Sequence, residues 1–467
     1  MYKSTILFLS VIRYLGIILS SIVSLTVAKL VTPKDYADWS MYLLIIQYFT
    51  ILTLGMEHGV GQITSLKFRN RKLVDVIFIV SLVIVLIIFL FLFIVVCFLN
   101  FEQIKFLREY NLYDKLGFIL ISATLFNFIN IGSNFLRAIG KLTPVVLSVM
   151  IFPSAVLLFL LYGNVSFERL VWIHIASFGL TLFFYCFKIG EINFSILRLT
   201  RLTRILISKS LKLLFFNIAV SLVLWSVKFL FAIFESKLFF SSLSLAFSIN
   251  QAYFLIIVNI TYLNYPKLLR LAKSNTFKNY EYLASMNEFF LQICLMFSVL
   301  SFIISPVVNL FFTKYYLFQK ALFITNTIQV LLLVPTLVYI LSTALNFQKK
   351  IGYLTIYFII YFSGLVYLLD FADIKIPLWI TFIICYIFYL VTCYKLTFKI
   401  CRNLKVFYTM ISVDVINFIF VLLILLFTAQ LSYSLAVQVI ILIYILSRFF
   451  INFSRYKSVT EYLFSHI

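Results

Sequence analysis

The chain has 467 residues, of which 64% are hydrophobic and 12% charged, and it carries a formal net charge of +22. A soluble fold with this composition would expose larger apolar patches than soluble monomers tolerate, so a soluble class is excluded. Strong basicity can indicate nucleic-acid binding, but here it follows a membrane-topology pattern, and we expect no nucleic-acid partner.

Apolar stretches long enough to cross a bilayer recur along the whole chain. A spanning helix needs about 20 mainly apolar residues, and we count about fourteen candidates. In chain order they cover 5–28, 39–64, 74–98, 115–136, 144–162, 169–187, 213–234, 238–263, 286–311, 321–345, 351–371, 377–394, 407–429 and 432–450. The first is longer than a signal-peptide core, which favours a retained helix. The predicted fold class is an all-α polytopic membrane protein with about 12 to 14 transmembrane helices.

Lysine and arginine gather in alternate loops, as they do when basic loops stay in the cytoplasm. Basic stretches follow each even-numbered predicted helix, whereas acidic residues are commoner in the other loops. This pattern predicts that both termini are cytoplasmic. The basic inner face should also attract anionic lipid headgroups.

The loops are too short to hold a catalytic domain, and no phosphate-binding GxxxxGK[ST] motif occurs. Six cysteines without a CxxC pair and three histidines do not indicate a metal site. We therefore expect neither a cofactor nor enzymatic activity. A membrane glycosyltransferase or polysaccharide polymerase would need carboxylates on an outer loop, and Asp35 and Asp38 come nearest to that pattern. We instead expect a solvated loop there, with Asp35 capping the next helix.

Similar phrases end the fourth and tenth predicted helices: LRAIGK at 136–141 and LNFQKK at 345–350. A spacing of six helices keeps the same orientation in the membrane, as in transporters built from parallel repeats. The repeat predicts an N-terminal six-helix lobe at 1–200, a C-terminal six-helix lobe at 201–400, and two extra helices at 401–467.

Six phrases, in this order, resemble polysaccharide flippases of the Wzx type, which belong to the multidrug, oligosaccharidyl-lipid and polysaccharide (MOP) exporter superfamily. The phrases are AKLVTPKDYA (28–37), LGMEHG (54–59), RAIGK (137–141), YPKL (265–268), LFFTKY (310–315) and ALNFQK (344–349). The chain departs from the family at Ala37, where glycine is usual, and in having more helices than most Wzx flippases.

The resemblance implies two lobes, related by a pseudo-twofold axis, around a central cavity that opens alternately to either side of a bacterial inner membrane. It implies a cargo, an O-antigen or capsule repeat unit on polyprenyl diphosphate, moved from the cytoplasmic to the periplasmic leaflet by an ion-coupled cycle during lipopolysaccharide or polysaccharide biosynthesis. A polymerase and other assembly proteins would be partners. A small-molecule exporter of the same superfamily, a polymerase or transferase, and a scaffold stay open as alternatives.

Ionisable side chains deep in a membrane are costly, so each is a functional hypothesis. Arg13 and the neighbours Glu57 and His58 lie at a similar predicted depth, which suggests an Arg13–Glu57 ion pair. The pair could exchange partners when a diphosphate arrives, with Arg13 and His58 binding the substrate and Glu57 a coupling proton. A fixed structural pair, or snorkelling to the interface, is the alternative.

Lys228 lies about fifteen residues into its predicted helix, which favours a substrate-binding position in the cavity over snorkelling toward Glu235. Asn250 and Gln251 could bind sugar hydroxyls or hold helices together. The remaining candidates are Lys29, at the cavity mouth or the outer interface; Asp414, a coupling-ion site or an interfacial group; and His174, expected to be structural.

Overall fold

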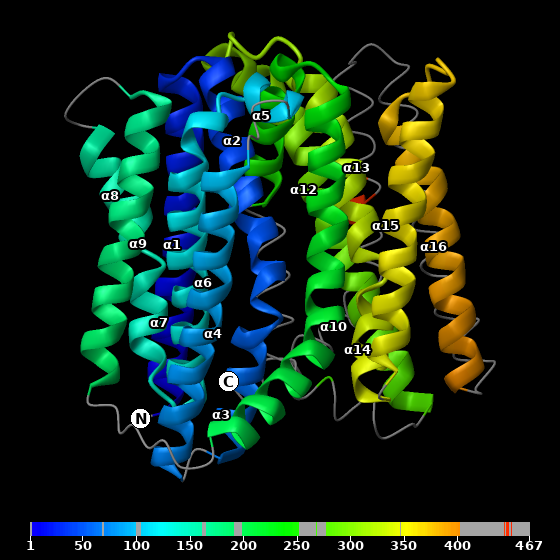
Figure 1. Cartoon of the computed structure of the whole chain (residues 1–467). Coiled ribbons are helices and arrows are strands. Elements are labelled where there is room, and N and C mark those ends of the chain that lie inside the picture. Colours follow the sequence, from blue (N-terminus) through cyan, green and yellow to red (C-terminus); the bar gives the residue numbers. More distant parts are fainter. Residues whose placement is uncertain are drawn as a thin grey trace. The chain divides into compact units, whose positions relative to one another are not determined.

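The computed structural model describes residues 2–67, 70–99, 104–160, 165–190, 199–251, 268, 277–345, 347–401, 443, 445–447 and 450. All the regular elements in these residues are helices (Figure 1). The chain forms two compact units, Met1–Ser241 and Ser242–Ile467, which are described separately below. The predicted lobes at 1–200 and 201–400 stay predictions.

Unit 1 contains six long helices and several short ones. In chain order these are α1 (Tyr2–Leu30), α2 (Pro33–Tyr48), η1 (Phe49–Thr53), α3 (Met56–Lys67), α4 (Arg71–Phe98), α5 (Lys105–Glu109), η3 (Tyr113–Lys115), α6 (Leu116–Ala138), α7 (Leu142–Ser148), α8 (Ile151–Leu160), α9 (Phe167–Ile189) and α10 (Leu199–Phe234). A further helix begins at Lys237 and is described as far as Gln251. The N-terminus and α3 lie at one end of the unit, and α5 at the other (Figure 1).

Unit 2 contains five described helices after residue 251. They are α12 (Phe277–Phe311), α13 (Phe318–Leu333), α14 (Thr336–Ala344), α15 (Gln348–Phe371) and α16 (Leu378–Cys401). Every residue of α13 from Ile324 to Leu333 is buried. By contrast, α15 exposes a row of large apolar side chains, among them Tyr357, Ile360 and Leu368.

The described residues include eight helices long and apolar enough to span a membrane, or up to ten if each bent pair counts as one span. The predicted all-α, polytopic membrane fold is therefore confirmed. The predicted helices 407–429 and 432–450 lie almost wholly outside the described residues.

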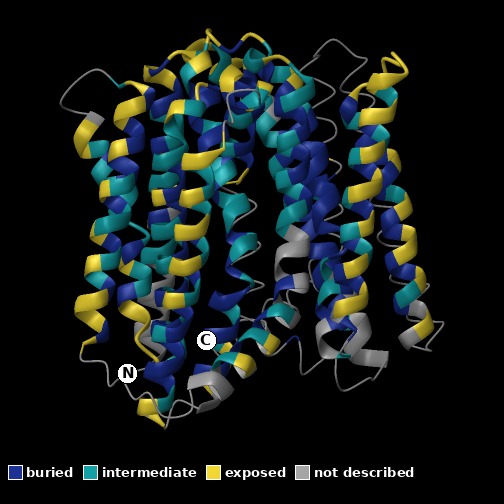
Figure 2. Ribbon diagram, in the orientation of Figure 1, coloured by how far each residue is buried: buried dark blue, intermediate teal, exposed yellow. Residues whose placement is uncertain are grey.

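Large apolar side chains remain exposed along the outward faces of several helices (Figure 2). On α4 these include Ile87, Leu90 and Phe91, each more than half exposed. Water would penalise such a surface, whereas lipid tails accept it without cost. These faces are consequently the lipid-facing surface of a multi-pass membrane protein.

Several predicted spans differ from the observed helices. The span 39–64 is broken between η1 and α3, where Pro33–Thr53 and Met56–Ser65 meet with a bend of 55°. The spans 144–162 and 321–345 are each divided into two helices. The helix predicted at 213–234 begins earlier, and α10 is 36 residues long. At about 1.5 Å per residue it extends beyond a hydrocarbon core about 30 Å thick.

Aromatic packing around His174 forms part of the core of unit 1. The His174 ring lies 5.4 Å from Trp39, 5.7 Å from Tyr42 and 4.0 Å from Phe178. Its Nδ1 is 3.3 Å from the Tyr42 hydroxyl, which is 2.5 Å from Ser122 Oγ. These contacts join α2, α6 and α9 and give His174 a packing position.

Candidate functional site

The second transmembrane segment is broken in the middle by two residues in the left-handed backbone region. Leu54 has φ 54° and Gly55 has φ 71°. A positive φ is unusual for leucine and ordinary for glycine. Broken helices inside membranes place helix ends, with their partial charges, at the depth where ligands bind. This break is the starting point of the candidate site.

Close packing between α3 and α10 fixes the break. A Cβ on Gly55 would lie 2.6 Å from the carbonyl oxygen of Ser210, and one on Gly59 would lie 1.9 Å from Ser210 Oγ. A side chain at Gly55 would clash with the backbone of α10, and one at Gly59 would displace the Ser210 hydroxyl. A Gly-x-x-x-Gly spacing is typical of tight helix contacts in membranes. The contact holds the first turn of α3 against α10.

Glu57 and His58 lie in that first turn. The Glu57 Oε1 atom is 3.4 Å from His58 Nε2, and the Glu57 side chain is 9% exposed while that of His58 is 31% exposed. The second carboxylate oxygen, Oε2, has no hydrogen-bond partner within the described chain. A carboxylate near a helix N-terminus is favoured by the helix dipole. Glu57 is thus a buried acidic group beside an accessible imidazole.

Arg137, in the last turn of α6, lies near this pair. Its Nη2 donates to Asn134 Oδ1 at 2.6 Å, and Asn134 Nδ2 donates to the Asn130 carbonyl at 2.9 Å. A Cβ on Gly61 of α3 would lie 3.4 Å from Asn134 Oδ1, so the two helices nearly touch here. Arg137 interacts electrostatically with both His58 and Arg13.

The structure therefore assembles three of the predicted site residues but pairs them differently. Arg13, on α1, is partly buried near Arg137. The contact described for the Glu57 carboxylate is with His58, not with the predicted partner Arg13. Depth along a helix does not give the direction in which a side chain points around the helix axis, so depth alone could not identify the partner of Glu57.

Lys228 is half-buried on α10, and its sequence neighbours on that helix contact Tyr48, the last residue of α2. Tyr48 packs on Trp225 and Phe229 at 5.8 and 5.6 Å, and its hydroxyl is 3.4 Å from Ser226 Oγ. Ser210, which contacts Gly55 and Gly59, lies about 27 Å from Lys228 along the helix axis. Lys228 and Glu57 thus occupy different levels of unit 1.

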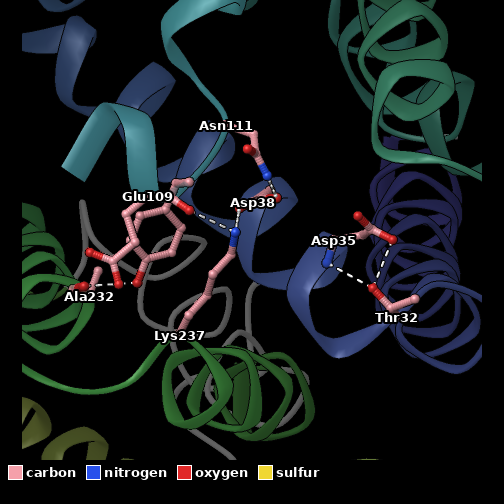
Figure 3. A network of polar contacts seen from close by, with 8 residues as sticks. Thr32, Asp35, Asp38, Glu109, Asn111, Ala232 and Lys237 are labelled. Carbon is pink, nitrogen blue, oxygen red and sulfur yellow. Dashed lines mark hydrogen bonds and ion pairs between the residues drawn. The ribbon is translucent and has the colours of Figure 1, made fainter. Parts of the chain in front are cut away.

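A second polar network lies at the end of unit 1 opposite the N-terminus, and we call its members Asp38, Tyr110, Asn111 and Lys237 the outer clamp (Figure 3). Lys237 Nζ lies 2.5 Å from Asp38 Oδ1, and Asn111 Nδ2 donates to Asp38 Oδ2 at 2.9 Å. Lys237 Nζ also donates to the Glu109 carbonyl at 2.8 Å. Asp38 is 1% exposed.

The outer clamp joins four segments of the chain. The Tyr110 hydroxyl donates to the Ala232 carbonyl at 2.8 Å and so satisfies the end of α10. Burial raises the pKa of Tyr110, and the nearby carboxylates of Glu109 and Asp38 raise it further. The phenol therefore stays protonated and able to donate. Lys237 lies over the Tyr110 ring at 5.4 Å. The start of α2, the α5 loop, the end of α10 and the following helix are thereby held together.

The residues of the predicted Asp35–Asp38 loop lie in α2. Thr32 is the N-cap of α2: its Oγ1 accepts from the Asp35 backbone N–H at 3.2 Å and donates to Asp35 Oδ2 at 2.8 Å. The prediction that Asp35 caps the helix is wrong, because Thr32 is the cap and Asp35 lies in the first turn of α2, where its carboxylate accepts from the Thr32 hydroxyl. Asp38 is not solvated, because the outer clamp buries it.

The remaining predicted residues are scattered. Lys29 is exposed in the last turn of α1. Asn250 is fully buried in unit 2, where its Nδ2 donates to Thr325 Oγ1 at 2.8 Å, whereas Gln251 is exposed. Asp414 lies outside the described residues. Asn250 thus makes the inter-helix contact that was the alternative to sugar binding.

Sequence reasoning missed three charges that are wholly or partly buried. Arg137, which is partly buried, was assigned to a cytoplasmic loop, because the predicted span ends at residue 136. Asp75 on α4 and Glu288 on α12 are 0% and 6% exposed, yet each lies near the predicted end of a span. In the sequence, each of these charges stands within a few residues of the end of an apolar run, and that position could have identified it as a candidate.

These features define a class of fold: a polytopic helical membrane protein with a broken second span and charged groups inside it. The chain is similar to lipid II flippase MurJ in its inward closed conformation, with a TM-score of 0.59 and 16% identity over 96% of this chain and 99% of that one. It is also similar to an inward-facing multidrug resistance MATE family transporter of the MOP superfamily, with a TM-score of 0.57 and 14% identity over 89% of this chain and 96% of that one.

At these identities the similarity establishes the fold alone. No protein-family model matches the sequence, and no curated protein matches it at a significant level.

Proposed function

We propose that this protein is a flippase that moves an oligosaccharide linked to polyprenyl diphosphate from the cytoplasmic to the periplasmic leaflet of a bacterial inner membrane. The observation that carries the proposal is the group of charges inside unit 1, with Glu57 and His58 at a helix break and Arg13 nearby. A sugar diphosphate cannot cross hydrocarbon unaided, whereas its polyprenyl tail can stay in lipid. The protein needs only to shield and bind the head.

The fold supports transport over catalysis. One of its structural neighbours is a lipid II flippase, which by its name handles a lipid-linked substrate. The six sequence phrases that resemble Wzx flippases support an oligosaccharide cargo of the O-antigen or capsule type. We expect no enzymatic step and no cofactor, and a polymerase acting on the delivered units is the expected partner.

In this proposal Arg13 and His58 bind the diphosphate, and Glu57 carries the coupling proton. Lys228 and Lys29 contact the cargo farther along its route. Asn250 and Gln251 are proposed sugar contacts, and Asp414 is proposed as a further coupling-ion site. Glu57 is the strongest of these candidates, because its Oε2 atom lacks a hydrogen-bond partner within the described chain.

Export of small molecules is the second candidate, favoured by the similarity to a multidrug resistance transporter. The two functions predict different phenotypes. An exporter protects cells against toxic cations, and its loss leaves polyprenyl-linked glycan on the correct side. A flippase leaves drug tolerance unchanged and alters the sidedness of the glycan.

The test measures the sidedness of polyprenyl-linked glycan in cells depleted of this protein, with a membrane-impermeant glycan-modifying enzyme. Complete single units accumulating on the inner face would establish flipping as the blocked step. Units that reach the outer face but stay unpolymerised would favour the polymerase alternative. Normal glycan together with lost drug tolerance would favour export.

A further inference from the structure

Basic side chains from three helices lie near one another at the end of unit 1 that holds the N-terminus. Arg137 of α6 interacts electrostatically with Arg13 of α1 and with His58 of α3. The three groups come from segments far apart in sequence, so their meeting is a product of the fold. Like charges repel, and the cost rises as water is excluded.

The backbone geometry brings these groups onto facing surfaces of two helices. His58 and Gly61 are one turn apart on α3, and Asn134 and Arg137 are one turn apart on α6, so each pair shares a face. The missing side chain at Gly61 lets Asn134 Oδ1 approach to 3.4 Å from the position a Cβ would occupy. Because the Arg137 guanidinium donates to the same Asn134 Oδ1 atom, it lies close to Gly61 of α3, one turn from His58.

Arg137 is held in a defined orientation. Asn134 Oδ1 accepts from Nη2 at 2.6 Å, and the Asn134 amide is itself anchored to the Asn130 carbonyl at 2.9 Å. Binding residues fixed in this way lose little conformational freedom when a ligand arrives. A guanidinium whose fork is fixed is suited to bidentate contact with phosphoryl oxygens.

We propose that Arg137 is a diphosphate-binding residue, with Asn134 as its positioning residue, and that together with Arg13 and His58 they form the loading site for the carrier's diphosphate. This proposal rests on the proposed flippase function. A diphosphate presents two adjacent phosphoryl groups, so one ligand can contact the two arginines and receive a hydrogen bond from the His58 imidazole. The predicted topology puts this end of α6 at the cytoplasmic face, where a cargo made in the cytoplasm would enter.

The test uses the purified full chain in nanodiscs of zwitterionic phosphatidylcholine, titrated by native mass spectrometry. The probes are undecaprenyl diphosphate, undecaprenyl monophosphate and phosphatidylglycerol. The wild type should bind the diphosphate most tightly. Arg137→Gln should weaken diphosphate binding about tenfold or more, because a charge-assisted contact is lost. The diphosphate affinity of Arg137→Lys should lie between those of the wild type and Arg137→Gln, because lysine keeps the charge but cannot make the bidentate contact of a guanidinium.

Lys141→Gln is the matched control. Lys141 is exposed at the same end of the molecule, its Nζ donates to the Lys188 carbonyl at 2.7 Å, and the substitution removes the same charge. Its diphosphate affinity should stay within about twofold of the wild type. Asn134→Leu, which keeps the charge but frees the arginine, should weaken diphosphate binding more than monophosphate binding.

Several outcomes would overturn the assignment. Wild-type affinity in Arg137→Gln, or an equal loss in Lys141→Gln, would remove Arg137 from the site while leaving the flippase proposal intact. Equal, Arg137-dependent binding of phosphatidylglycerol would identify a bilayer-lipid site instead. No diphosphate binding by the wild type would count against both proposals. Thermal unfolding of each variant checks folding, and Arg137→Lys remains informative if Arg137→Gln does not fold.

Discussion

Glu57 combines three properties that rarely occur together in one side chain. It lies inside a membrane span, it is 9% exposed, and one of its carboxylate oxygens lacks a hydrogen-bond partner among the described residues. Burying an uncompensated carboxylate is costly, so a residue kept for packing alone would be more stable as an amide or an apolar group.

We expect Glu57→Gln to lower glycan delivery to the outer leaflet about tenfold or more without reducing membrane abundance, because the amide cannot take up a proton. The matched control is Glu168→Gln, which removes an exposed acid paired with Lys115 and should leave delivery within about twofold of the wild type. The measurement is the fraction of glycan accessible to the impermeant enzyme. Equal delivery by both variants would show that Glu57 takes no part in coupling.

Lys228 carries a second prediction at this scale. Lys228→Met keeps the length and apolar character of the stem but removes the charge. We expect transport to fall severalfold with normal abundance, since an intramembrane lysine is expensive to keep unless it serves a ligand. Lys115→Met, in the short helix η3 before α6, serves as the control in the same delivery assay. Full activity of Lys228→Met would leave Lys228 as a snorkelling residue.

At the scale of elements, the break in the second span depends on contact between α3 and α10. A methyl group at Gly59 would collide with Ser210 Oγ at 1.9 Å, and neither helix can move away without disturbing the break. Glycine therefore has a steric role here, and its position beside Glu57 links packing to the candidate site.

Gly59→Ala should destabilise the protein by about 1–3 kcal/mol, as overpacking does. Ser210→Gly removes the colliding atoms, so the double variant should be more stable than the sum of the single effects predicts. Thermal unfolding of the purified protein measures all four members of the cycle. The control is Gly179→Ala, because a Cβ there meets nothing within 4 Å. Additive effects in the cycle would show that this contact does not set the geometry.

The outer clamp predicts a different stability pattern. Asp38→Asn breaks an ion pair whose two side chains are 2% and 15% exposed, and the remaining Lys237 charge stays buried. The expected loss is about 3–5 kcal/mol. Asp35→Asn, three residues away in a half-exposed cap, should cost about 1 kcal/mol or less. If thermal unfolding shows equal costs, Asp38 is not the anchor of the clamp.

At the scale of the whole molecule, length and hydropathy were enough to predict the spans, because the bilayer fixes how long an apolar helix must be. They could not show the break at Leu54 and Gly55, since one glycine in an apolar run is a weak signal. The Gly55–Gly59 spacing was visible, but its meaning depended on Ser210, far along the chain. Asp38 was wrongly predicted to be solvated for the same reason, because its hydrogen-bond partner Asn111 lies 73 residues away in the sequence.

The candidate site was predicted only in part. Depth along the helices singled out Arg13, Glu57 and His58 as candidates, since charges inside spans are rare. The partner of Glu57 and the involvement of Arg137 depended on the azimuth of each side chain and on how α3 meets α6. Neither is encoded in hydropathy, which reports burial in lipid rather than contact between helices.

The orientation of the whole molecule follows from its charge pattern and can be tested with single cysteines. Cys97 and Cys186 are exposed, so the test needs a background in which all six native cysteines are replaced. Asp114 and Lys375 are exposed in loops predicted to face outward, whereas Thr143 and Lys350 are exposed where the chain is predicted to face inward.

We expect an impermeant maleimide to label Asp114→Cys and Lys375→Cys in intact spheroplasts, and Thr143→Cys and Lys350→Cys only after permeabilisation. The reason is that translocating the basic loops would work against the membrane potential and against the anionic inner leaflet. Asp114 and Thr143 report on unit 1, and Lys350 and Lys375 report on unit 2. If the labelling of only one unit were inverted, the predicted number of helices between residues 143 and 350 would be wrong by one. Inversion of all four would place Arg137 at the periplasmic face and remove the cytoplasmic loading site with it.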